Sequence, residues 1–331
     1  GSLMKKFKAI LVTDNEGEFE LLKKEIPFED LPDGEVLIRV NYSSINYKDG
    51  LALNGNKGKV IRKFPMVPGI DLAGVVEESS SIDFKEGDQV VATGSGLSET
   101  VWGGFSEFAR LDSNKVIHIP KGIDLKRSMA IGTAGFTSML CVLALEKNGI
   151  NKEKNVIVTG AAGGVGSIAV AVLANLGYKV TASTGREENI SFLKNLGAID
   201  CISRENLMRD SKPLESATWG GAIDTVGGEI ISTIIAQLDR NSSVASCGNA
   251  GGINLNSTVL PFILRGVNLL GIDSVNCEYN LRKEAWSRLE RDLPLEKLDS
   301  LSNLISFEEL LDESKKILNG SIRGRTIVKI N

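Results

Sequence analysis

A turn of small residues lies between a β-rich segment and a helix-like segment in the middle of the chain. It reads Val-Thr-Gly-Ala-Ala-Gly-Gly-Val-Gly over residues 158–166, with the spacing Ala161-x-Gly163-x-x-Gly166. This is a G-x-G-x-x-G pattern with Ala at its first position, and such turns let backbone N–H groups and a helix N-terminus approach a pyrophosphate. An ordinary tight turn between a strand and a helix is the alternative. The pattern predicts a dinucleotide-binding turn.

The segments around this turn complete a βαβ unit. Residues 155–159 are β-rich, residues 167–176 are helix-like, and residues 178–183 form a second predicted strand. A site that prefers NAD places a carboxylate after that second strand, where it binds the ribose 2′-hydroxyl. This chain has Ser183-Thr184-Gly185-Arg186 there, and a guanidinium suits a 2′-phosphate. We therefore expect NADPH, with a merely solvated Arg186 as the alternative.

Length, composition and charge narrow the class of protein. With 331 residues, 42% hydrophobic and 24% charged, the chain is long enough for two globular lobes. A net charge of −4 gives no general attraction to nucleic acid. Gly1-Ser2-Leu3 resembles a cleavage remnant before Met4, and neither a signal peptide nor an apolar span of membrane length follows. We expect a cytoplasmic protein with no nucleic-acid or membrane partner.

The distribution of predicted elements indicates a nucleotide-binding lobe inserted into a second lobe. The first part of the chain is β-rich and predicts a barrel-like domain, with strands at residues 8–13, 35–43, 73–77, 89–93 and 105–111. From about residue 128, helices and strands alternate, as in a doubly wound sheet. Further strands are predicted there at residues 222–226, 243–247 and 268–272. A helix over 306–318 and a strand over 325–330 return to the first lobe, and we expect the substrate between the lobes.

Several segments together carry a family resemblance that spans almost the whole chain. They are Ser44–Gly50, Phe64–Asp71, Trp102–Gly104, Ile131–Thr137, Ala222–Gly227, Pro261–Arg265, Gly271–Ser274 and Gly324–Thr326. In order and spacing these segments resemble the zinc-free medium-chain dehydrogenases/reductases. Within them the chain is most similar to the acryloyl-CoA reductase branch, also called the YhdH/YhfP family of quinone oxidoreductases.

The resemblance implies a domain organisation. The fold would be α/β, with a GroES-like β-barrel catalytic domain at residues 4–127 and 295–331. A Rossmann domain with a doubly wound parallel sheet would span residues 128–294 and bind NADPH. The resemblance also implies a homodimer formed through the sheet edge of the nucleotide-binding domain.

The residues argue independently against a catalytic zinc ion. Zinc-dependent relatives have Gly-His-Glu where this chain has Gly69-Ile70-Asp71, and here no cysteine precedes Cys141. With His118 as the single histidine, a His and Cys ligand set cannot be assembled. We expect no metal ligands. His118 lies in the strand-like Val-Ile-His-Ile-Pro and is expected to be structural, with a general-acid role as the alternative.

Reduction of an activated C=C bond does not need a metal. A nicotinamide hydride attacks the β-carbon of an enoyl thioester, hydrogen-bond donors stabilise the negative charge on the carbonyl oxygen, and a proton is added at the α-carbon. The resemblance implies reduction of a short enoyl-CoA, most directly acryloyl-CoA to propanoyl-CoA. An NADPH:quinone oxidoreductase on the same fold is one alternative. A non-enzymatic NADPH-binding sensor is an alternative of another class.

One polar segment offers the residues for this chemistry. Tyr47 is the first candidate to touch nicotinamide and substrate, as a hydrogen-bond donor or as a positioning group. An ordinary phenol has a pKa near 10, so positioning is favoured over proton donation unless a neighbour such as Lys48 perturbs it. Lys48 is otherwise simply an exposed charge. Asn46 and Asp49 are further catalytic candidates, with fixing of the loop as the alternative.

The remaining site predictions come from the resemblance and from charge. By resemblance the cofactor contacts are Tyr47, Ala162, Gly163, Gly164, Val165, Thr184, Gly185, Arg186, Thr225, Leu269 and Arg325. Thr133 flanks the nicotinamide or caps a helix, and Arg325 binds a phosphate or fixes the C-terminal strand. Four basic residues of a barrel loop could receive the phosphates of coenzyme A, although a solvated loop would look similar: Lys57, Lys59, Arg62 and Lys63.

Overall fold

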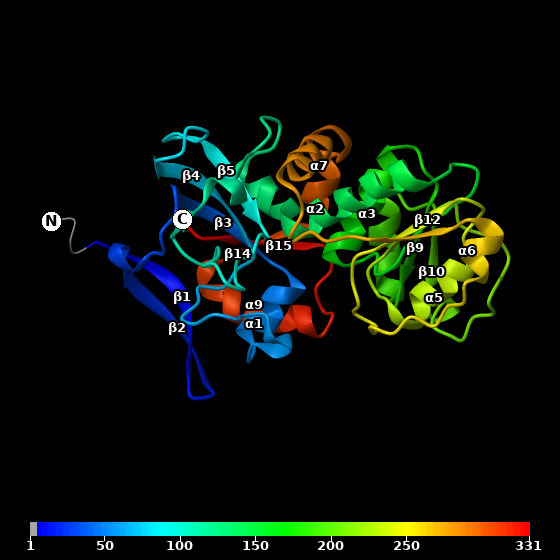
Figure 1. Cartoon of the computed structure of the whole chain (residues 1–331), viewed down its shortest axis with the longest axis horizontal. Coiled ribbons are helices and arrows are strands. Elements are labelled where there is room, and N and C mark those ends of the chain that lie inside the picture. The colour runs from blue at the N-terminus through cyan, green and yellow to red at the C-terminus, as the bar shows by residue number, and fades with distance from the viewer. Residues whose placement is uncertain (1–4) are drawn as a thin grey trace. The chain divides into compact units, whose positions relative to one another are not determined.

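The computed structural model describes residues 5–331, so the expected cleavage remnant at residues 1–4 lies outside the described residues. The chain divides into two compact units (Figure 1). The first unit holds the chain up to Thr133 together with Ser274–Trp286 and Ser302–Asn331. The second unit holds Ala134–Asp273 and Ser287–Leu301. The domain boundaries expected from the sequence, 4–127 with 295–331 and 128–294, stay a prediction beside this division.

The first unit is built on a mixed sheet of the GroES-like type. Its strand order is β14-β15-β3-β4-β5-β7, with β6 also paired to β3. Neighbouring strands run antiparallel except for the parallel pair β14 and β15. The strands are β3 (Val36–Ile45), β4 (Asp71–Ser79), β5 (Gln89–Thr93), β6 (Phe108–Leu111), β7 (Ile117–His118), β14 (Ser302–Ser306) and β15 (Arg325–Lys329). The predicted return of the C-terminal strand is confirmed, because β15 pairs with β3.

A hairpin of β1 (Lys6–Asn15) and β2 (Glu18–Pro27) adds to this unit. Only β1 of the two was predicted, because half of the residues of β2 are charged and Ile26 alone among its ten residues is buried. Isolated bridges from Ala9 to Ser106 and from Val12 to Met66 attach the hairpin to the segments that precede β6 and β4. Helices α1 (Tyr47–Leu53) and α9 (Leu310–Leu318) pack on each other in the same unit.

The second unit is a parallel doubly wound sheet with helices packed on it (Figure 1). Its strand order is β10-β9-β8-β11-β12-β13, and the chain direction across the sheet reverses between β8 and β11. This reversal is the switch point at which doubly wound folds bind nucleotides. The strands are β8 (Val156–Val158), β9 (Val180–Thr184), β10 (Asp200–Ser203), β11 (Gly221–Asp224), β12 (Ser243–Ser246) and β13 (Asn268–Gly271). The predicted α/β fold is confirmed.

Apolar helix faces bury the core of this unit. Ile230, Ile231, Ile234 and Ile235 pack with the sheet residues Ile157 and Val244 in one buried cluster. The helices are α3 (Gly164–Asn175), α4 (Ile190–Leu196), α5 (Gly228–Gln237), α6 (Leu260–Arg265) and α8 (Leu295–Ser300), with α2 (Leu125–Asn148) and α7 (Tyr279–Asp292) contributing residues to both units. Short 3-10 helices are η2 (Phe28–Asp30), η3 (Lys57–Lys59), η4 (Ser113–Lys115), η5 (Glu187–Asn189), η6 (Arg204–Asn206) and η7 (Phe307–Glu309).

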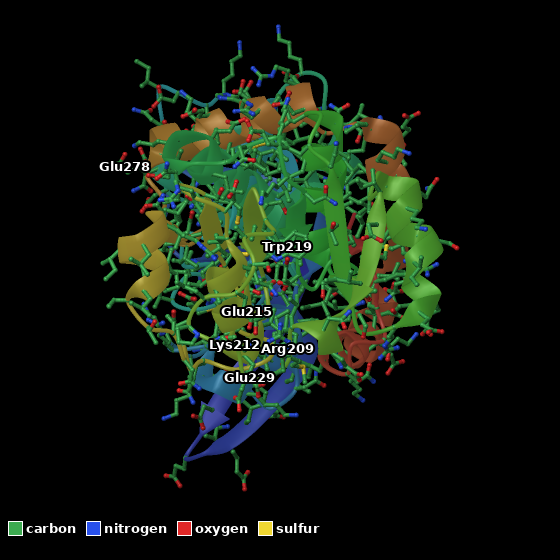
Figure 2. The ribbon with its side chains drawn as sticks, turned by 90° about the vertical axis from the view of Figure 1, so that its right-hand side faces the viewer. Arg209, Lys212, Glu215, Trp219, Glu229 and Glu278 are labelled. Atoms are coloured by element: carbon green, nitrogen blue, oxygen red, sulfur yellow. The ribbon has the colours of Figure 1, made fainter. Side chains whose placement is uncertain are left out.

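The long connection from β10 to β11 is held by charged contacts on the surface of the second unit. Both terminal nitrogens of Arg209 donate to Glu215, at 2.9 and 2.8 Å (Figure 2). Hydrogen bonding from Arg209 lowers the pKa of Glu215 to about 2. This bidentate pair fixes a segment that has no secondary structure of its own between η6 and β11.

Helix α2 is bent at Gly132, which adopts a left-handed φ of 53°. Among residues 5–331, α2 alone has the length and apolar composition of a membrane-spanning helix, and 83% of its apolar window is buried inside the protein. A mostly buried helix of this kind is typical of a protein core. The bend directs the backbone amide of Thr133 toward the buried carboxylate of Asp71.

Candidate active site

The glycine-rich turn leads directly into α3, as predicted. Gly163 is the N-cap residue of α3, and within the described chain no side chain caps this helix. The first helical N–H groups are therefore available to an anion. A Cβ at Gly166 would lie 2.3 Å from the carbonyl oxygen of Gly160, so a side chain there would collide with the turn. Residues 162–165 are partly exposed, and this arrangement fits a pyrophosphate on the turn.

A polar cluster joins β8 to β11 at the switch point. The Thr159 hydroxyl donates to Asp224 Oδ1 at 2.7 Å, and Thr225 in turn donates from its amide and its hydroxyl to Thr159, at 3.0 Å each. Asp224 is buried, and desolvation raises the pKa of its carboxyl group. Thr225 stands at the carboxyl edge of the sheet, where it was predicted. The sequence analysis did not single out Asp224, whose role depends on a strand pair that only the fold creates.

The end of β9 carries the residues predicted to bind the adenosine ribose. The Thr184 hydroxyl accepts from the Arg186 amide at 3.4 Å and from Asn189 Nδ2 at 3.3 Å, which fixes the turn. The Arg186 guanidinium is half-exposed and lies 3.9 Å from Glu188 Oε1. Within the described residues this turn has no carboxylate in the position that an NAD-type ribose contact requires, since β9 ends on Ser183 and Thr184.

A second guanidinium lies at the same turn and was missed by the sequence analysis. A Cβ built on Gly185 would lie 2.7 Å from both Cζ and Nε of Arg204. Arg204 opens η6, directly after β10, and Ser203 of β10 pairs with Thr184 of β9. Arg186 and Arg204 therefore flank one turn from two neighbouring strands. The signal was absent from the sequence because the four-residue strand β10 was not predicted.

Leu269 lies apart from the other predicted cofactor residues. It is in the middle of the edge strand β13, paired with Val244 of β12, and it is partly exposed. The structure does not bring it to the carboxyl end of β11 beside Thr225. Its cofactor contact stays a prediction.

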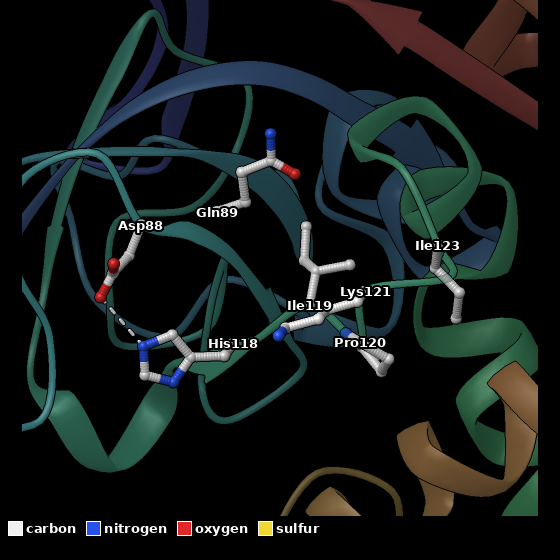
Figure 3. A pocket seen from close by; sticks show the side chains of 7 residues that line it. All are labelled: Asp88, Gln89, His118, Ile119, Pro120, Lys121 and Ile123. Atoms are coloured by element: carbon white, nitrogen blue, oxygen red, sulfur yellow. Dashed lines mark hydrogen bonds and ion pairs between the residues drawn. The ribbon is translucent and has the colours of Figure 1, made fainter.

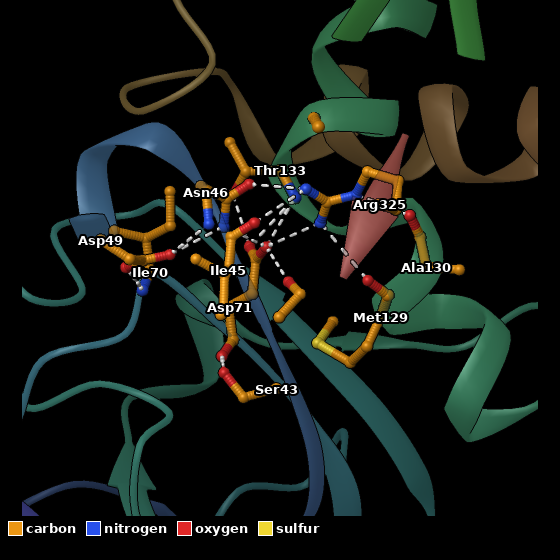
Figure 4. A network of polar contacts seen from close by, with 12 residues as sticks. Ser43, Ile45, Asn46, Asp49, Ile70, Asp71, Met129, Ala130, Thr133 and Arg325 are labelled. Atoms are coloured by element: carbon orange, nitrogen blue, oxygen red, sulfur yellow. Dashed lines mark hydrogen bonds and ion pairs between the residues drawn. The ribbon is translucent and has the colours of Figure 1, made fainter. Parts of the chain in front are cut away.

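In the first unit, the candidate Tyr47 is the first residue of α1 and its side chain is 52% exposed. The preceding residue, Asn46, forms a capping box with Asp49. The amide nitrogen of Asn46 donates to Asp49 Oδ2 at 2.8 Å, and the Ile70 amide donates to Asp49 Oδ1 at 3.0 Å (Figure 4). Asn46 and Asp49 are buried and fix the start of the helix, so Tyr47 is presented by a rigid element.

Asp71 is the centre of the same network. It accepts from the hydroxyl of Ser44 at 2.6 Å, from Asn46 Nδ2 at 2.9 Å and from the Thr133 amide at 3.0 Å. A Cβ at Gly132 would lie 2.4 Å from Asp71 Oδ2, so the bend of α2 requires glycine. The backbone amide and the side-chain hydroxyl of Thr133 both donate hydrogen bonds to the Asp71 carboxylate, and neither of these two bonds caps a helix. Its contact with the nicotinamide stays a prediction.

Arg325 supplies the positive charge of this network. Its side chain is 2% exposed, Nε donates to the Ala130 carbonyl at 2.8 Å, and Nη1 donates to Asn46 Oδ1 at 3.2 Å (Figure 4). Nη2 lies 3.7 Å from Asp71 Oδ2. These contacts favour fixing of the C-terminal strand over a direct phosphate contact.

Two carboxyl groups and one guanidinium are thus buried together. Burial raises the pKa of Asp49 to about 7, and the negative charge of Asp71 adds to that increase. Hydrogen bonds from Asn46 and Ile70 oppose it. Asp49 therefore changes its protonation near neutral pH, in the first turn of the helix that carries Tyr47.

Lys48, the neighbour of Tyr47, is paired elsewhere. Its ammonium forms an ion pair with Glu99 of the loop after β5. The basic loop of the sequence analysis follows α1: Lys57, Lys59, Arg62 and Lys63 are exposed, whereas Val60 and Ile61 between them are buried. The side chain of Asn56 clamps this loop through hydrogen bonds with the amide and the carbonyl of Ile61, at 2.8 and 3.0 Å.

His118 lies on β7 and is one of the residues that line a pocket of the first unit (Figure 3). Its Nε2 is 3.0 Å from Asp88 Oδ2, and its ring stacks on Phe84. A hydrogen bond from the Lys85 amide and the contact with His118 lower the pKa of Asp88. These contacts are compatible with a structural role for His118, which stays a prediction.

Family models and relatives match this architecture. Residues 32–121 match the alcohol dehydrogenase GroES-like domain, and residues 164–291 match the family described as zinc-binding dehydrogenase. The acrylyl-CoA reductase AcuI of Ruegeria pomeroyi is 46% identical over 329 residues, which cover 98% of this chain and 99% of that protein. The chain belongs to the acrylyl-CoA reductase branch of the medium-chain dehydrogenases/reductases. The resemblance inferred from its sequence segments is confirmed.

Solved structures of proteins from the same branch have the same fold as this chain. The YhdH oxidoreductase of Salmonella enterica, determined in complex with NADP, is 45% identical and superposes with a TM-score of 0.95, covering 98% of this chain and 100% of that one. The Bacillus subtilis protein YhfP, determined with NAD bound, is 44% identical with a TM-score of 0.94 and covers 98% and 99%. Proteins named quinone oxidoreductases also match: this same YhfP carries the name putative quinone oxidoreductase, and a quinone oxidoreductase of Sus scrofa is 27% identical over 78% of this chain. Within residues 5–331 no group of three His, Cys, Asp or Glu side chains is placed to hold a metal ion.

Proposed function

We propose that this protein is an NADPH-dependent, zinc-independent reductase of the activated C=C bond of a short enoyl-CoA, with acryloyl-CoA converted to propanoyl-CoA. The observation that carries the proposal is the match over nearly the whole of both chains to a protein named acrylyl-CoA reductase. A fold is shared by many activities, but such a full-length match includes the segments around the site.

The second unit has the residues for NADPH. The turn from Ala162 to Val165 and the N-terminus of α3 bind the pyrophosphate, and Thr225 lies at the switch point for the nicotinamide ribose. Arg186 and Arg204 take the 2′-phosphate, because the Arg204 guanidinium packs against Gly185 and Arg186 follows Gly185 in the chain, where an NAD site would need a carboxylate. Bound NADPH would supply the hydride to the β-carbon of the thioester.

The first unit contributes Tyr47. The side chain is exposed at the start of a helix whose neighbouring residues are locked by hydrogen bonds, so its backbone is already ordered when the ring packs on nicotinamide and substrate. Asn46 and Asp49 act through Tyr47 as positioning residues. Lys48 is engaged with Glu99 and is not assigned to proton transfer.

The basic loop is assigned to coenzyme A. Lys57, Lys59, Arg62 and Lys63 expose their charged groups on one short segment with a fixed backbone. Such a cluster attracts the phosphates of coenzyme A more strongly than it attracts a neutral quinone. Raising the salt concentration should therefore increase the KM for acryloyl-CoA and leave a quinone unaffected.

The absence of a catalytic zinc ion is part of the proposal. Asp71 stands where zinc-dependent relatives have a ligand segment, and its oxygens already accept hydrogen bonds from Ser44, Asn46 and Thr133. Elemental analysis of the purified protein and activity after EDTA treatment test this directly. Stoichiometric zinc together with loss of activity on chelation would overturn it.

We further propose a cytoplasmic homodimer that has neither nucleic acid nor membrane as a partner. The net charge is −4, and the long apolar helix α2 is mostly buried. The second unit exposes apolar side chains on α6, on the segment before it and on the edge strand β13: Ile253, Leu255, Val259, Leu260, Ile263, Leu264 and Leu269. A second copy that pairs along β13 would cover both the edge and these side chains.

The decisive experiment follows NADPH absorbance with acryloyl-CoA, crotonyl-CoA and a simple quinone, with NADH as the control cofactor. Preference for acryloyl-CoA and NADPH supports the proposal. Turnover confined to the quinone would make the protein a quinone oxidoreductase. Tight NADPH binding without any turnover would favour the sensor.

A further inference from the structure

The loop between β5 and Val101 connects the candidate catalytic helix to the basic loop. The side chain of Glu99 forms an ion pair with Lys48 on the first turn of α1. The carbonyl oxygen of the same residue accepts from the Arg62 amide at 2.9 Å. One residue thus contacts both the element that carries Tyr47 and the segment that carries the exposed cations.

This ion pair is shielded from solvent. The side chain of Glu99 is 12% exposed and that of Lys48 is 33% exposed. A pair that is partly removed from water is screened less than a surface pair and holds its geometry more firmly. It is therefore a stronger connection than the exposed ion pairs elsewhere in the unit, such as Lys23 with Glu308.

The loop that carries Glu99 has an unfavourable backbone conformation. Ser95 and Ser98 have left-handed φ values of 54° and 71°, and within the described residues the buried Ser98 hydroxyl has no hydrogen-bond partner. Such a loop keeps its conformation only when surrounding contacts hold it. Lys115 contributes one such contact, from Nζ to the Ser95 carbonyl at 2.9 Å, and Lys48 contributes another.

We propose that Glu99, through its pair with Lys48, is a positioning residue that sets the spacing between Tyr47 and the basic loop. It thereby selects an enoyl group carried on coenzyme A over the same group on a short thiol. The inference rests on the proposed function. The thioester and the phosphates of coenzyme A are separated by the pantetheine arm, and here their two binding elements are separated by α1, whose seven residues span about 10 Å.

The test compares acryloyl-CoA with S-acryloyl-N-acetylcysteamine, which has the same thioester on the cysteamine end of the arm and lacks the pantothenate part, the adenosine and the phosphates. We expect Glu99→Gln and Lys48→Met each to raise the KM for acryloyl-CoA by about fivefold, and the double variant to be no worse than either single one, because the two residues act as one pair. The KM for the short thioester should change by less than about twofold. Glu308→Gln, which breaks the exposed pair with Lys23, is the matched control.

Each alternative outcome is distinguishable. Equal losses on both thioesters in the variants, or no loss on either, would overturn the inference and leave the proposed function standing. A wild-type protein that reduces neither thioester would overturn the proposed function and the inference with it. If the single variants have a lower melting temperature than the wild type, the exchanged pair Lys48→Glu with Glu99→Lys provides the second test, because it restores the ion pair. That variant should recover the preference for acryloyl-CoA, and failure to recover it in a folded protein also counts against the inference.

Discussion

The carboxylates of Asp49 and Asp71 share a single amide donor. Asn46 Nδ2 lies 3.0 Å from Asp49 Oδ2 and 2.9 Å from Asp71 Oδ2. Two buried acids are thus linked through the residue directly before Tyr47, and Arg325 is the one cation that the described residues place in contact with this network. The arrangement ties the position of a candidate catalytic side chain to the charge state of this network.

The first prediction concerns pH. The pKa of Asp49 is about 7 in the folded protein and near 3.9 in an unfolded chain, so the folded state holds a proton that the unfolded state releases between these values. This contribution to stability is fully present below about pH 4 and is lost as the pH rises to about 7, so stability should fall by about 3 kcal/mol between pH 5 and pH 8, most of it below pH 7. Asp49→Asn should lack this slope. Urea unfolding at pH 5, 6, 7 and 8 measures it.

Asp88→Asn is the control for this experiment. The pKa of Asp88 is lowered in the folded protein, so the fall in stability toward alkaline pH should persist in this variant. The same slope in wild type and Asp49→Asn would show that Asp49 is not the titrating group.

The second prediction separates the two roles of Arg325. Arg325→Met leaves Asp71 buried without its cation and should lower the free energy of unfolding by about 3 kcal/mol. Arg325→Lys should lose less. The affinity of the folded variants for NADPH should stay within about threefold of the wild type, since the guanidinium is directed into the protein. Melting curves and NADPH titrations provide both values.

The neighbouring Arg323→Gln removes an exposed charge and serves as the comparison. A tenfold loss of NADPH affinity in Arg325→Lys with unchanged stability would instead assign Arg325 to a phosphate.

The third prediction concerns cofactor choice. Arg186→Ala and Arg204→Ala should each weaken NADPH binding by about 10- to 100-fold and leave NADH binding nearly unchanged, because a charge-assisted hydrogen bond contributes roughly 1.5–3 kcal/mol. Arg240→Ala on the same unit is the control. Equal loss with both cofactors would mean that these arginines hold the turn and do not contact a 2′-phosphate.

The sequence predicted elements whose signal is local. The turn at Ala161-x-Gly163-x-x-Gly166 was found because its spacing alone describes the contact that a phosphate needs. Arg204 was missed because it reaches Gly185 only through the pairing of Ser203 with Thr184 across two strands. The partner of Lys48 was missed for the same reason, since Glu99 is 51 residues away along the chain.

The buried network around Asp71 could not be predicted for the same reason, because its members are even farther apart in the sequence. Arg325 and Asn46 are 279 positions apart and meet because β15 pairs with β3. The sequence supplied Asn46, Asp49 and Arg325 as candidates, but their common role depends on this pairing. Periodicity and composition carry no information on such a contact.

The fourth prediction addresses how Tyr47 acts. If it positions the cofactor and substrate, Tyr47→Phe should keep kcat within about tenfold of the wild type, because the ring is retained. Tyr47→Ala should lose about 100-fold, since the packing surface is removed. Steady-state kinetics with both substrates varied measures this. A Tyr47→Phe variant as inactive as Tyr47→Ala would make the hydroxyl group the proton donor.

The last prediction concerns assembly. Ile263 of α6 is 69% exposed, and with Val259, Leu264 and the edge strand β13 it forms an apolar surface on the second unit. Exposed apolar side chains beside an unpaired strand edge are unfavourable in a monomer, and a two-fold partner would bury them. Ile263→Glu should place a charge in that interface and shift the protein from dimer to monomer in sedimentation at micromolar concentration. Ile82→Glu, at a fully exposed position of the first unit, should leave assembly unchanged. A wild-type protein that sediments as a monomer would refute the dimer, and an Ile263→Glu variant that stays dimeric would place the interface elsewhere.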